Sequence, residues 1–343
     1  MAIFKTEDTK GKKEDLASFI SMITRDETPF LSSIGTKKAA GVFHEWQTDS
    51  LSAPVVNAKA EGLDFTAADT PVSTTRLGNY SQILIKEIKI SKTLDSVSKA
   101  GRNSEFAYQM KKKGTELKRD LENALIGTRQ ITTGSGVADA VGDNTGRKMG
   151  GYQSWVPKEN NWDASAGTPA FQSAAGGDGK TAHTAPTAGT HVLALTDVDE
   201  VMQRVYEEGG KASILMMSPS NKRSFSTLAQ GAGSNTRRNI DEKGSLRQSV
   251  ELYESDFGVV KVVPNFIQGL ASSVDISDGV GGATDVIVYD PSWWSMASLR
   301  ALSTTDVGQK GDSTVGMMVE ETTLECRNPH GSALISGIGV IVS

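Results

Sequence analysis

Residues suited to catalysis or metal binding are scarce in this chain. Its 343 residues include four histidines and one cysteine, Cys326. A single cysteine cannot close a disulfide within the chain. The histidines are not spaced three or four residues apart, as paired zinc ligands on a helix are: His44, His183, His191 and His330. We therefore predict no metal site and no cofactor, and His44 reads as a structural or interface histidine within a strand.

Three strings resemble catalytic motifs without the context that each motif needs. Residues 174–181 end like a phosphate-binding loop, but Ala174 stands where the first glycine is required. Residues 256–258 spell the kinase triad Asp-Phe-Gly without its companion loops, and they fit a hairpin turn better. Residues 218–220 lack the glycines that flank a nucleophile elbow. We therefore predict no catalytic residue.

Two groups of acidic residues suggest no site either. Asp139, Asp143 and Asn144 do not have the spacing of a calcium-binding EF-hand, and a solvated glycine loop explains them better. The second group lies in an alternating strand, where exposed carboxylates are ordinary: Glu320, Glu321 and Glu325.

Charge and hydropathy exclude further classes of protein. The chain has 36 Lys and Arg against 41 Asp and Glu, a net charge of -5. Such a chain is poorly suited to wrapping nucleic acid, because that requires basic surface that displaces counterions. No apolar run of about eighteen residues could span a membrane, and the polar start lacks the apolar core of a signal peptide.

Hydrophobic periodicity predicts an arm and a long hairpin at the start of the chain. Residues 1–12 are polar, and an apolar stripe over 16–23 indicates a short helix that ends before Pro29. Residues 42–51 and 70–91 are typical of extended strands. Two arms of about twenty residues would reach about 60 Å, which is too long to pack on a small body. We expect this hairpin to lie on something else.

A long helix is predicted next, over residues 104–127, with Asn103 as its N-cap. Apolar residues spaced by four and seven form its buried stripe: Phe106, Met110, Leu117, Leu121 and Leu125. A set of basic residues lies mostly away from that stripe: Lys111, Lys112, Lys113, Lys118 and Arg119. They form either a solvated face or an electrostatic seat for an acidic loop of a neighbour.

The rest of the chain divides into a glycine-rich stretch and an α/β segment. Residues 131–191 predict no long regular element, which is unusual in a compact domain, and we interpret them as an excursion stabilised by packing between subunits. A helix begins at Thr196, with Asp199 completing a capping box. Strands and one further helix, begun by Ser218 and Pro219, follow, and the last forty residues alternate like a sheet. The strands are predicted at 213–217, 249–254, 259–263 and 285–289.

This order of elements, together with specific strings, resembles the tailed-phage major capsid proteins of the Hong Kong 97-type fold. Residues 26–35 (DETPFLSSIG) and 44–51 (HEWQTDSL) are similar to the opening of the SU-ten-type major capsid family. Residues 147–151 (RKMGG) before Trp155 and residues 253–258 (YESDFG) are also similar to that family. The resemblance covers nearly the whole chain.

The resemblance implies an α+β chain with an N-terminal arm, an extended β-hairpin loop, a peripheral domain with a long spine helix, and an axial α/β domain. The expected boundaries are an arm at 1–41, a loop at 42–91, a peripheral domain at 92–130 and 301–343, the excursion at 131–191, and an axial domain at 192–300. The loop would lie across an adjacent subunit.

It also implies a structural, non-catalytic role in the virion. The expected partners are copies of the chain in hexamers and pentamers, double-stranded DNA held without sequence-specific binding, and separate scaffold, portal and decoration proteins. Assembly would take place in the host cytoplasm. The arm is short and Met1 is present, so we expect no cleavage of a scaffold segment. We also expect non-covalent contacts, because no sequence rule selects an asparagine to crosslink with Lys59 or Lys86.

Function would then reside in contacts between subunits. The candidate contact residues lie on the hairpin and on the long helix: Trp46, Ile83, Ile85, Ile88, Lys111, Lys112 and Lys113. Two alternatives remain. The same fold serves cellular nanocompartments that enclose cargo enzymes, and an enzyme could use residues 130–190 as a lid.

Overall fold

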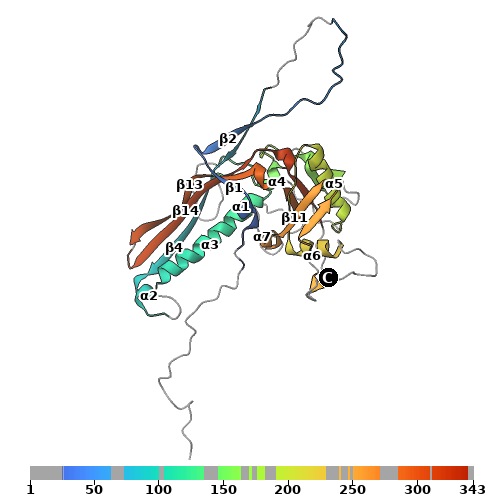
Figure 1. Ribbon diagram of the computed structural model, residues 1–343. Helices are drawn as coiled ribbons and strands as arrows, with labels where there is room; N and C mark the ends of the chain where they lie inside the picture. The colour runs from blue at the N-terminus through green and yellow to red at the C-terminus, as the bar shows by residue number, and fades with distance from the viewer. Residues whose placement is uncertain are drawn as a thin grey trace, which may run out of the picture.

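The structure is a computed structural model, and it describes residues 25, 27–62, 73–99, 104–134, 146–163, 170–171, 176–181, 191–228, 239–240, 246–247, 250–270, 285–309 and 311–338. Figure 1 shows an elongated wing of sheet and helix, a body built on a second sheet, and a hairpin that projects from their junction. Some predictions fall outside the described residues: the helix over 16–23, Asn103, Ala174, His183 and the loop with Asp139, Asp143 and Asn144. The mixture of helices and strands confirms the predicted α+β class.

The wing is a four-stranded sheet with strand order β1-β13-β14-β4. Strand β1 runs parallel to β13, and the other neighbours are antiparallel. The bounds are β1 (Gly35–Lys38), β13 (Trp294–Gln309), β14 (Ser313–Cys326) and β4 (Gln82–Ser91). Two short helices adjoin it, α1 (Pro29–Ser33) before β1 and α2 (Lys92–Ser96) after β4.

Helix α3 (Glu105–Ile126) lies along the wing and is the helix predicted over 104–127. The Ser104 side chain accepts a hydrogen bond from the Ala107 backbone N–H, so the predicted cap at Asn103 is wrong by one residue. The predicted stripe is largely confirmed, since four of its members are buried: Met110, Leu117, Leu121 and Leu125. Because these side chains face β4 and β14, only one face of the wing sheet is covered by the helix.

The body is a seven-stranded sheet with strand order β10-β11-β7-β12-β15-β5-β6. Its strands are β10 (Leu252–Ser255), β11 (Gly258–Pro264), β7 (Ile214–Met217), β12 (Val286–Tyr289), β15 (Ala333–Ser336), β5 (Asn161–Asp163) and β6 (Ala170–Phe171). Strands were predicted at the positions of β7, β10, β11 and β12, and they are confirmed there. The remaining short elements are α7 (Phe266–Leu270), η3 (Pro291–Trp293), η4 (Pro329–Gly331), β8 (Asn239–Ile240) and β9 (Leu246–Arg247).

The central strands of this sheet, β7, β12 and β15, are buried on both faces. Alternate residues of a strand point to opposite faces, so Leu215 and Met217 enter one core while Met216 enters the other. Helices α5 (Leu195–Glu207) and α6 (Pro219–Leu228) cover the first face. The end of α3 and the aromatic residues of the wing–body junction cover the second.

The caps of the body helices agree only in part with the sequence predictions. Ser218 Oγ accepts a hydrogen bond from the Asn221 N–H, which confirms the predicted cap of α6. Helix α5 begins one residue before Thr196, and Asp197 accepts the Ala194 N–H. The predicted box with Asp199 is wrong, because that carboxylate accepts a hydrogen bond from the Tyr253 hydroxyl instead.

The glycine-rich stretch contributes to the chain's own core. Helix α4 (Tyr152–Trp155) places two fully buried aromatic side chains there, and η2 (Lys158–Asn160) leads into β5. At Gly151 a Cβ atom would lie 2.3 Å from the Gly127 backbone oxygen, so only glycine permits α4 to lie this close to the end of α3. The interpretation that packing between subunits stabilises this stretch is therefore wrong for residues 149–156.

The projecting hairpin is shorter than predicted. Strands β2 (Phe43–Thr48) and β3 (Thr75–Tyr80) pair antiparallel, and residues 49–62 extend beyond them. The predicted strand over 70–91 divides at Ser81, where β4 begins and joins the wing. The final strands also separate, because β14 lies in the wing whereas β15 lies in the body rather than in a peripheral domain.

Candidate assembly surfaces

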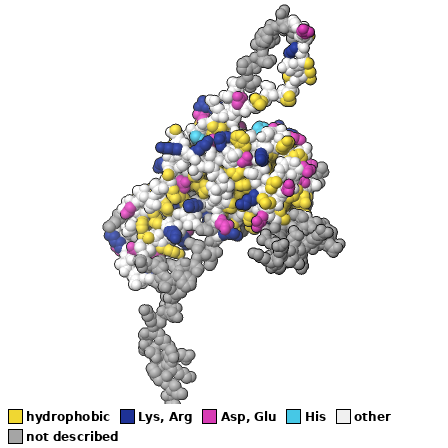
Figure 2. Space-filling model, in the orientation of Figure 1, with side chains coloured by type: hydrophobic (Ala, Val, Ile, Leu, Met, Phe, Trp, Pro, Cys, Tyr) yellow, Lys and Arg dark blue, Asp and Glu magenta, His cyan; other side chains and the backbone are white. Residues whose placement is uncertain are grey.

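The projecting hairpin exposes apolar side chains that no described part of the chain covers. Leu51 is 99% exposed, Val55 81% and Val56 96%. Figure 2 shows yellow side chains along this part of the hairpin, far from the body. Full burial of a side chain of this size stabilises a structure by about 1.5–3 kcal/mol, so this arm has the composition of a contact surface.

Trp46, a predicted contact residue, instead anchors the hairpin to its own subunit. Its ring lies 5.3 Å from that of Trp155, and it packs against the buried core of the junction. Trp46 Nε1 is buried and has no hydrogen-bond partner in the described part of the chain. The side chain therefore fixes the base of the hairpin.

The predicted isoleucines of β4 divide between the two faces of the wing. Ile83 is 42% exposed and Ile85 48%, both on the face away from α3. Ile88 is buried against Met110 and Met318 in the core beneath the helix. The Ile88 side chain is 6% exposed, so it offers little surface for the contact predicted for it. Ile83 and Ile85 remain available for the predicted contact with a neighbour.

The predicted lysines of α3 are on its outer surface. Lys111 and Lys112 are exposed, whereas Lys113 pairs with Glu116 at 2.6 Å. Partial burial would raise the pKa of Glu116, but the hydrogen bond and charge of Lys113 hold it below its usual value. Lys113 is thus engaged within the helix, and Lys111 and Lys112 are the better candidates for a neighbour.

The carboxylates of β14 were predicted to be exposed, and that prediction is wrong. Glu325 is 3% exposed, with Lys37 Nζ at 2.7 Å and His44 Nε2 at 3.1 Å. Burial alone would raise the pKa of Glu325, but these hydrogen bonds hold it below its usual value. Glu320 and Glu321 are also buried. His44 therefore has the structural role predicted for it.

Glu321 forms a second clamp at the base of the hairpin. It accepts hydrogen bonds from the Ser81 hydroxyl at 2.8 Å, Arg147 at 2.9 Å and Arg300 at 2.7 Å. These donors come from the end of β3, the glycine-rich stretch and β13. One carboxylate thus joins three segments that are far apart in the sequence.

Asn79 completes this attachment. Its amide donates to the Gly150 and Leu324 carbonyl oxygens at 3.2 and 2.7 Å, and its oxygen accepts the Gly150 N–H at 2.9 Å. Sequence reasoning did not identify Asn79 or Arg147. Two signals were available in the sequence. One was Asn79, a polar residue in a predicted strand, and the other was the RKMGG string, whose Gly150 contacts Asn79 in the fold.

A third buried carboxylate joins the wing and the body to the N-terminal segment that contains α1. Glu122 of α3 accepts the Phe30 and Leu31 backbone N–H groups at 2.8 and 2.7 Å, and the Asn265 side-chain amide at 2.8 Å. It thereby satisfies the free N–H groups at the start of α1. Phe30 is fully buried, with its ring 5.1 Å from that of Tyr289. The DETPFLSSIG string is thus a junction of the fold.

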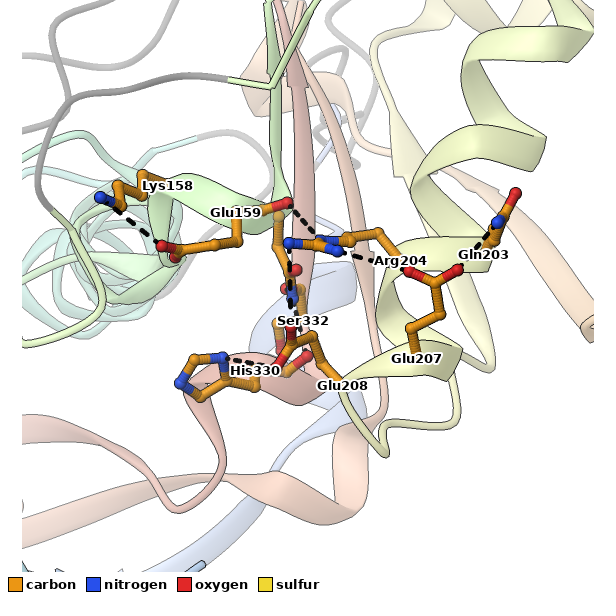
Figure 3. A network of polar contacts seen from close by, with 9 residues as sticks. Lys158, Glu159, Gln203, Arg204, Glu207, Glu208, His330 and Ser332 are labelled. Carbon is orange, nitrogen blue, oxygen red and sulfur yellow. Dashed lines mark hydrogen bonds and ion pairs between the residues drawn. The ribbon is translucent and has the colours of Figure 1, made fainter. Parts of the chain in front are cut away.

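The end of α5 carries a polar network, shown in Figure 3. Arg204 donates to the Glu159 backbone oxygen at 3.2 Å and pairs with Glu207 at 3.4 Å. Glu208 lies 3.4 Å from His330 of η4. The network ties helix α5 to η2 and η4, and its groups are arranged to hold elements together rather than to activate a nucleophile.

The described residues offer no metal centre. Among them, no group of three or more His, Cys, Asp or Glu side chains could hold a metal ion. Cys326 is fully buried, and burial raises the pKa of its thiol. A search of the described helices finds none with the length and hydropathy needed to cross a bilayer.

Solved structures with a similar arrangement identify the fold. A chain from Mycobacterium phage Ogopogo superposes with a TM-score of 0.58 at 11% identity, covering 98% of this chain and 99% of that one. The capsid of a native GTA particle gives a TM-score of 0.57 at 15% identity over 97% and 98% of the two chains. The fold is that of a Hong Kong 97-type capsid subunit, as the sequence resemblance predicted.

The family follows from sequence. The family described as SU10 major capsid protein matches residues 3–339, so the chain belongs to this family and is a major capsid protein of a tailed phage. The major capsid protein of Escherichia phage Phieco32 is 27% identical over 359 residues, covering 97% of this chain and 96% of that protein. The predicted family, fold and function are confirmed, and the family's role is structural.

Proposed function

We propose that this chain forms hexamers and pentamers, which close an icosahedral shell around double-stranded DNA held without sequence-specific contacts. Assembly in the host cytoplasm would use separate scaffold and portal proteins, with decoration proteins added to the shell, and the contacts would be non-covalent. The chain would have no catalytic role. The family match supports this proposal, since its members are capsid proteins.

The observation that carries the proposal is the projecting arm. An isolated chain gains nothing from holding Leu51, Val55 and Val56 in water, because exposed apolar surface is unfavourable. The base of the same hairpin is fixed by the Glu321 and Glu325 clamps. A rigid base and an apolar end suit an element that reaches to a neighbouring subunit.

We propose the uncovered face of the wing as the surface that receives this arm. Ile83 and Ile85 of β4 are exposed on the face that α3 does not cover, and Leu302 and Val307 of β13 are 39% and 59% exposed. Contact between the arm and this surface would bury apolar groups on both partners. We propose Ile83 and Ile85 as part of this contact, and Lys111 and Lys112 as a separate electrostatic seat for a neighbour's acidic loop.

The experiment is a deletion of residues 52–72, which leaves the β2–β3 ladder intact. We expect a folded subunit that forms no closed shells in negative-stain electron microscopy. A triple variant, Leu51→Ser with Val55→Ser and Val56→Ser, should behave alike without shortening the chain. The control is Tyr206→Ser on α5, a side chain that is 63% exposed and outside the arm. Normal shells from the deletion would refute the role of the arm.

The contents of the particles test the remaining part of the proposal, namely that the shell encloses double-stranded DNA. Shells from infected cells should contain double-stranded DNA. Shells that instead enclose a cargo enzyme and no DNA would favour a nanocompartment.

A further inference from the structure

A pocket lies where α1, β1 and η3 meet the start of β13. Its volume is about 370 Å³, and its mixed lining includes hydroxyl and cationic side chains: Ser33, Thr36, Lys37, Ser292, Ser295 and Arg327. Figure 2 shows dark blue Lys and Arg side chains gathered near the base of the projecting hairpin, the same part of the molecule. We call this site the oxyanion pocket.

The oxyanion pocket has more positive than negative charge. Lys37 and Arg327 are 41% and 44% exposed, whereas Glu325, which lies between them and His44, is 3% exposed. Within the described residues, Glu325 is the one carboxylate that pairs with either cation. One buried carboxylate balances one of the two permanent cations, so the rim retains a positive charge.

Arg327 is held in position for a further ligand. Its guanidinium lies 6.0 Å from the centre of the Trp293 ring and donates a hydrogen bond to the Ser292 backbone oxygen. Its Nε is 3.9 Å from Glu325, which is beyond hydrogen-bond distance. Guanidinium N–H donors therefore remain for a planar oxyanion, and little side-chain entropy is lost on binding because the group is already fixed.

Ser295 and the edge of β1 add neutral donors. Ser295 is 2% exposed, and its hydroxyl has no partner in the described structure. Among the described strands, β1 is an edge strand, with only β13 beside it. The Ala39 N–H bonds to the Ser298 oxygen, so by alternation the backbone groups of Thr36 and Lys38 point away from β13. An extended peptide could pair with that edge.

We propose that the oxyanion pocket binds an acidic side chain from an extended segment of a second copy of this chain. The carboxylate would bind Arg327 and Lys37, and the backbone of the segment would pair with β1. A second copy is the partner that fits, because the chain has more acidic than basic residues and, under the proposed function, assembles with copies of itself. This inference rests on the proposed function, and it adds a contact independent of the projecting arm.

Zero-length carbodiimide crosslinking tests the contact. Shells assembled from an equal mixture of unlabelled and isotope-labelled chains are treated with the reagent, which joins amines to carboxylates in contact, and digested for mass spectrometry. We expect a Lys37 peptide of one label joined to an acidic peptide of the other. A link from Lys37 to Glu325 of the same chain is an internal standard, because those atoms are 2.7 Å apart.

Two variants control the result. Arg327→Gln should reduce the mixed-label link about tenfold, the factor expected for loss of one charge-assisted hydrogen bond, while the internal link persists. Lys211→Gln, an exposed cation of α5's following loop, should leave both links unchanged. Shells in which Lys37 links only within its own chain would overturn this inference and leave the proposed function intact. If the unchanged chain forms no shells even with the scaffold protein of its phage present, both fail.

Discussion

The body and the wing of this subunit are both built on sheets, but they bury them differently. Every residue of β12 and β15 is buried, because helices cover one face and the aromatic junction covers the other. In the wing, α3 covers one face of β4 and β14, and residues 301–307 of β13 are exposed throughout. The central strands of the body are covered within one chain, whereas the wing and arm present surfaces that a neighbour can complete.

The two regions also differ in what holds them. Large aromatic side chains fill the core at the junction with the body, including Phe30, Tyr152 and Trp155. The base of the hairpin combines the packing of Trp46 against this core with polar clamps, in which Glu321, Glu325 and Asn79 join segments distant in the sequence. Polar clamps depend on geometry, so they fix the direction of the arm.

The largest effect on stability is expected in the core. Trp155→Ala should lower the free energy of unfolding by about 3–5 kcal/mol, because it removes a fully buried aromatic side chain and leaves a cavity. Urea unfolding of the unassembled subunit measures this. A loss below about 1 kcal/mol would mean that the junction can collapse around the gap, and the contrast between the regions would weaken.

The next effect is expected at the hairpin base. Asn79→Ala should cost about 1–3 kcal/mol, since it leaves the buried Gly150 N–H without a partner. Hydrogen exchange should also rise in β2 and β3, because the hairpin loses its attachment. Asn57→Ala, on the exposed arm, is the matched control and should change neither measurement.

A pH dependence should distinguish the body from the arm. Burial raises the pKa of Asp285 to about 7, against hydrogen bonds from Gln153 and the Gly337 backbone. The unfolded carboxyl ionises near pH 4, so folding takes up a proton between about pH 4 and 7. Stability should therefore fall as pH rises through this window, by at most about 1.4 kcal/mol per pH unit.

Thermal unfolding from pH 4 to 8 measures this slope. Asp285→Asn should flatten the curve, whereas Asp49→Asn on the exposed arm should leave it unchanged. An unaltered slope in Asp285→Asn would assign the dependence to other groups.

The smallest effect on stability is expected in the arm. Val56→Ser should change the free energy of unfolding by less than about 0.5 kcal/mol, because the side chain is 96% exposed. Shell yield should nevertheless fall. A destabilised monomer would show that the arm packs on its own subunit in solution.

The sequence predicted local structure well because local structure follows periodicity. The stripe of α3 and the strands of the body were found this way. Burial of Glu321 and Glu325 was not, because alternation reveals two faces of a strand but not what covers each. The burial of Ile88 was not predictable for the same reason. Only the pairing of β4 with β14 shows that this strand leaves the hairpin and joins the wing.

The junction was the least predictable part. Glu122, Asn79 and Arg147 act through partners dozens of residues away, and a single sequence contains no signal for such pairs. The burial of residues 149–156 in the glycine-rich stretch was not predicted, for a related reason. Short elements such as α4 have little periodicity, and their buried position depends on the fold around them.

The position of β15 has a consequence for synthesis. Residues 333–336 come late in the chain, yet they form an inner strand, paired with β12 on one side and β5 on the other. Until residues 333–336 have been synthesised, β5 and β6 have no sheet to join. Both cores of the body then remain uncovered at the position of β15. A prematurely terminated chain therefore presents unpaired strand edges instead of a finished body. We therefore expect a chain that ends before residue 333 to lack a finished body and not to enter a shell.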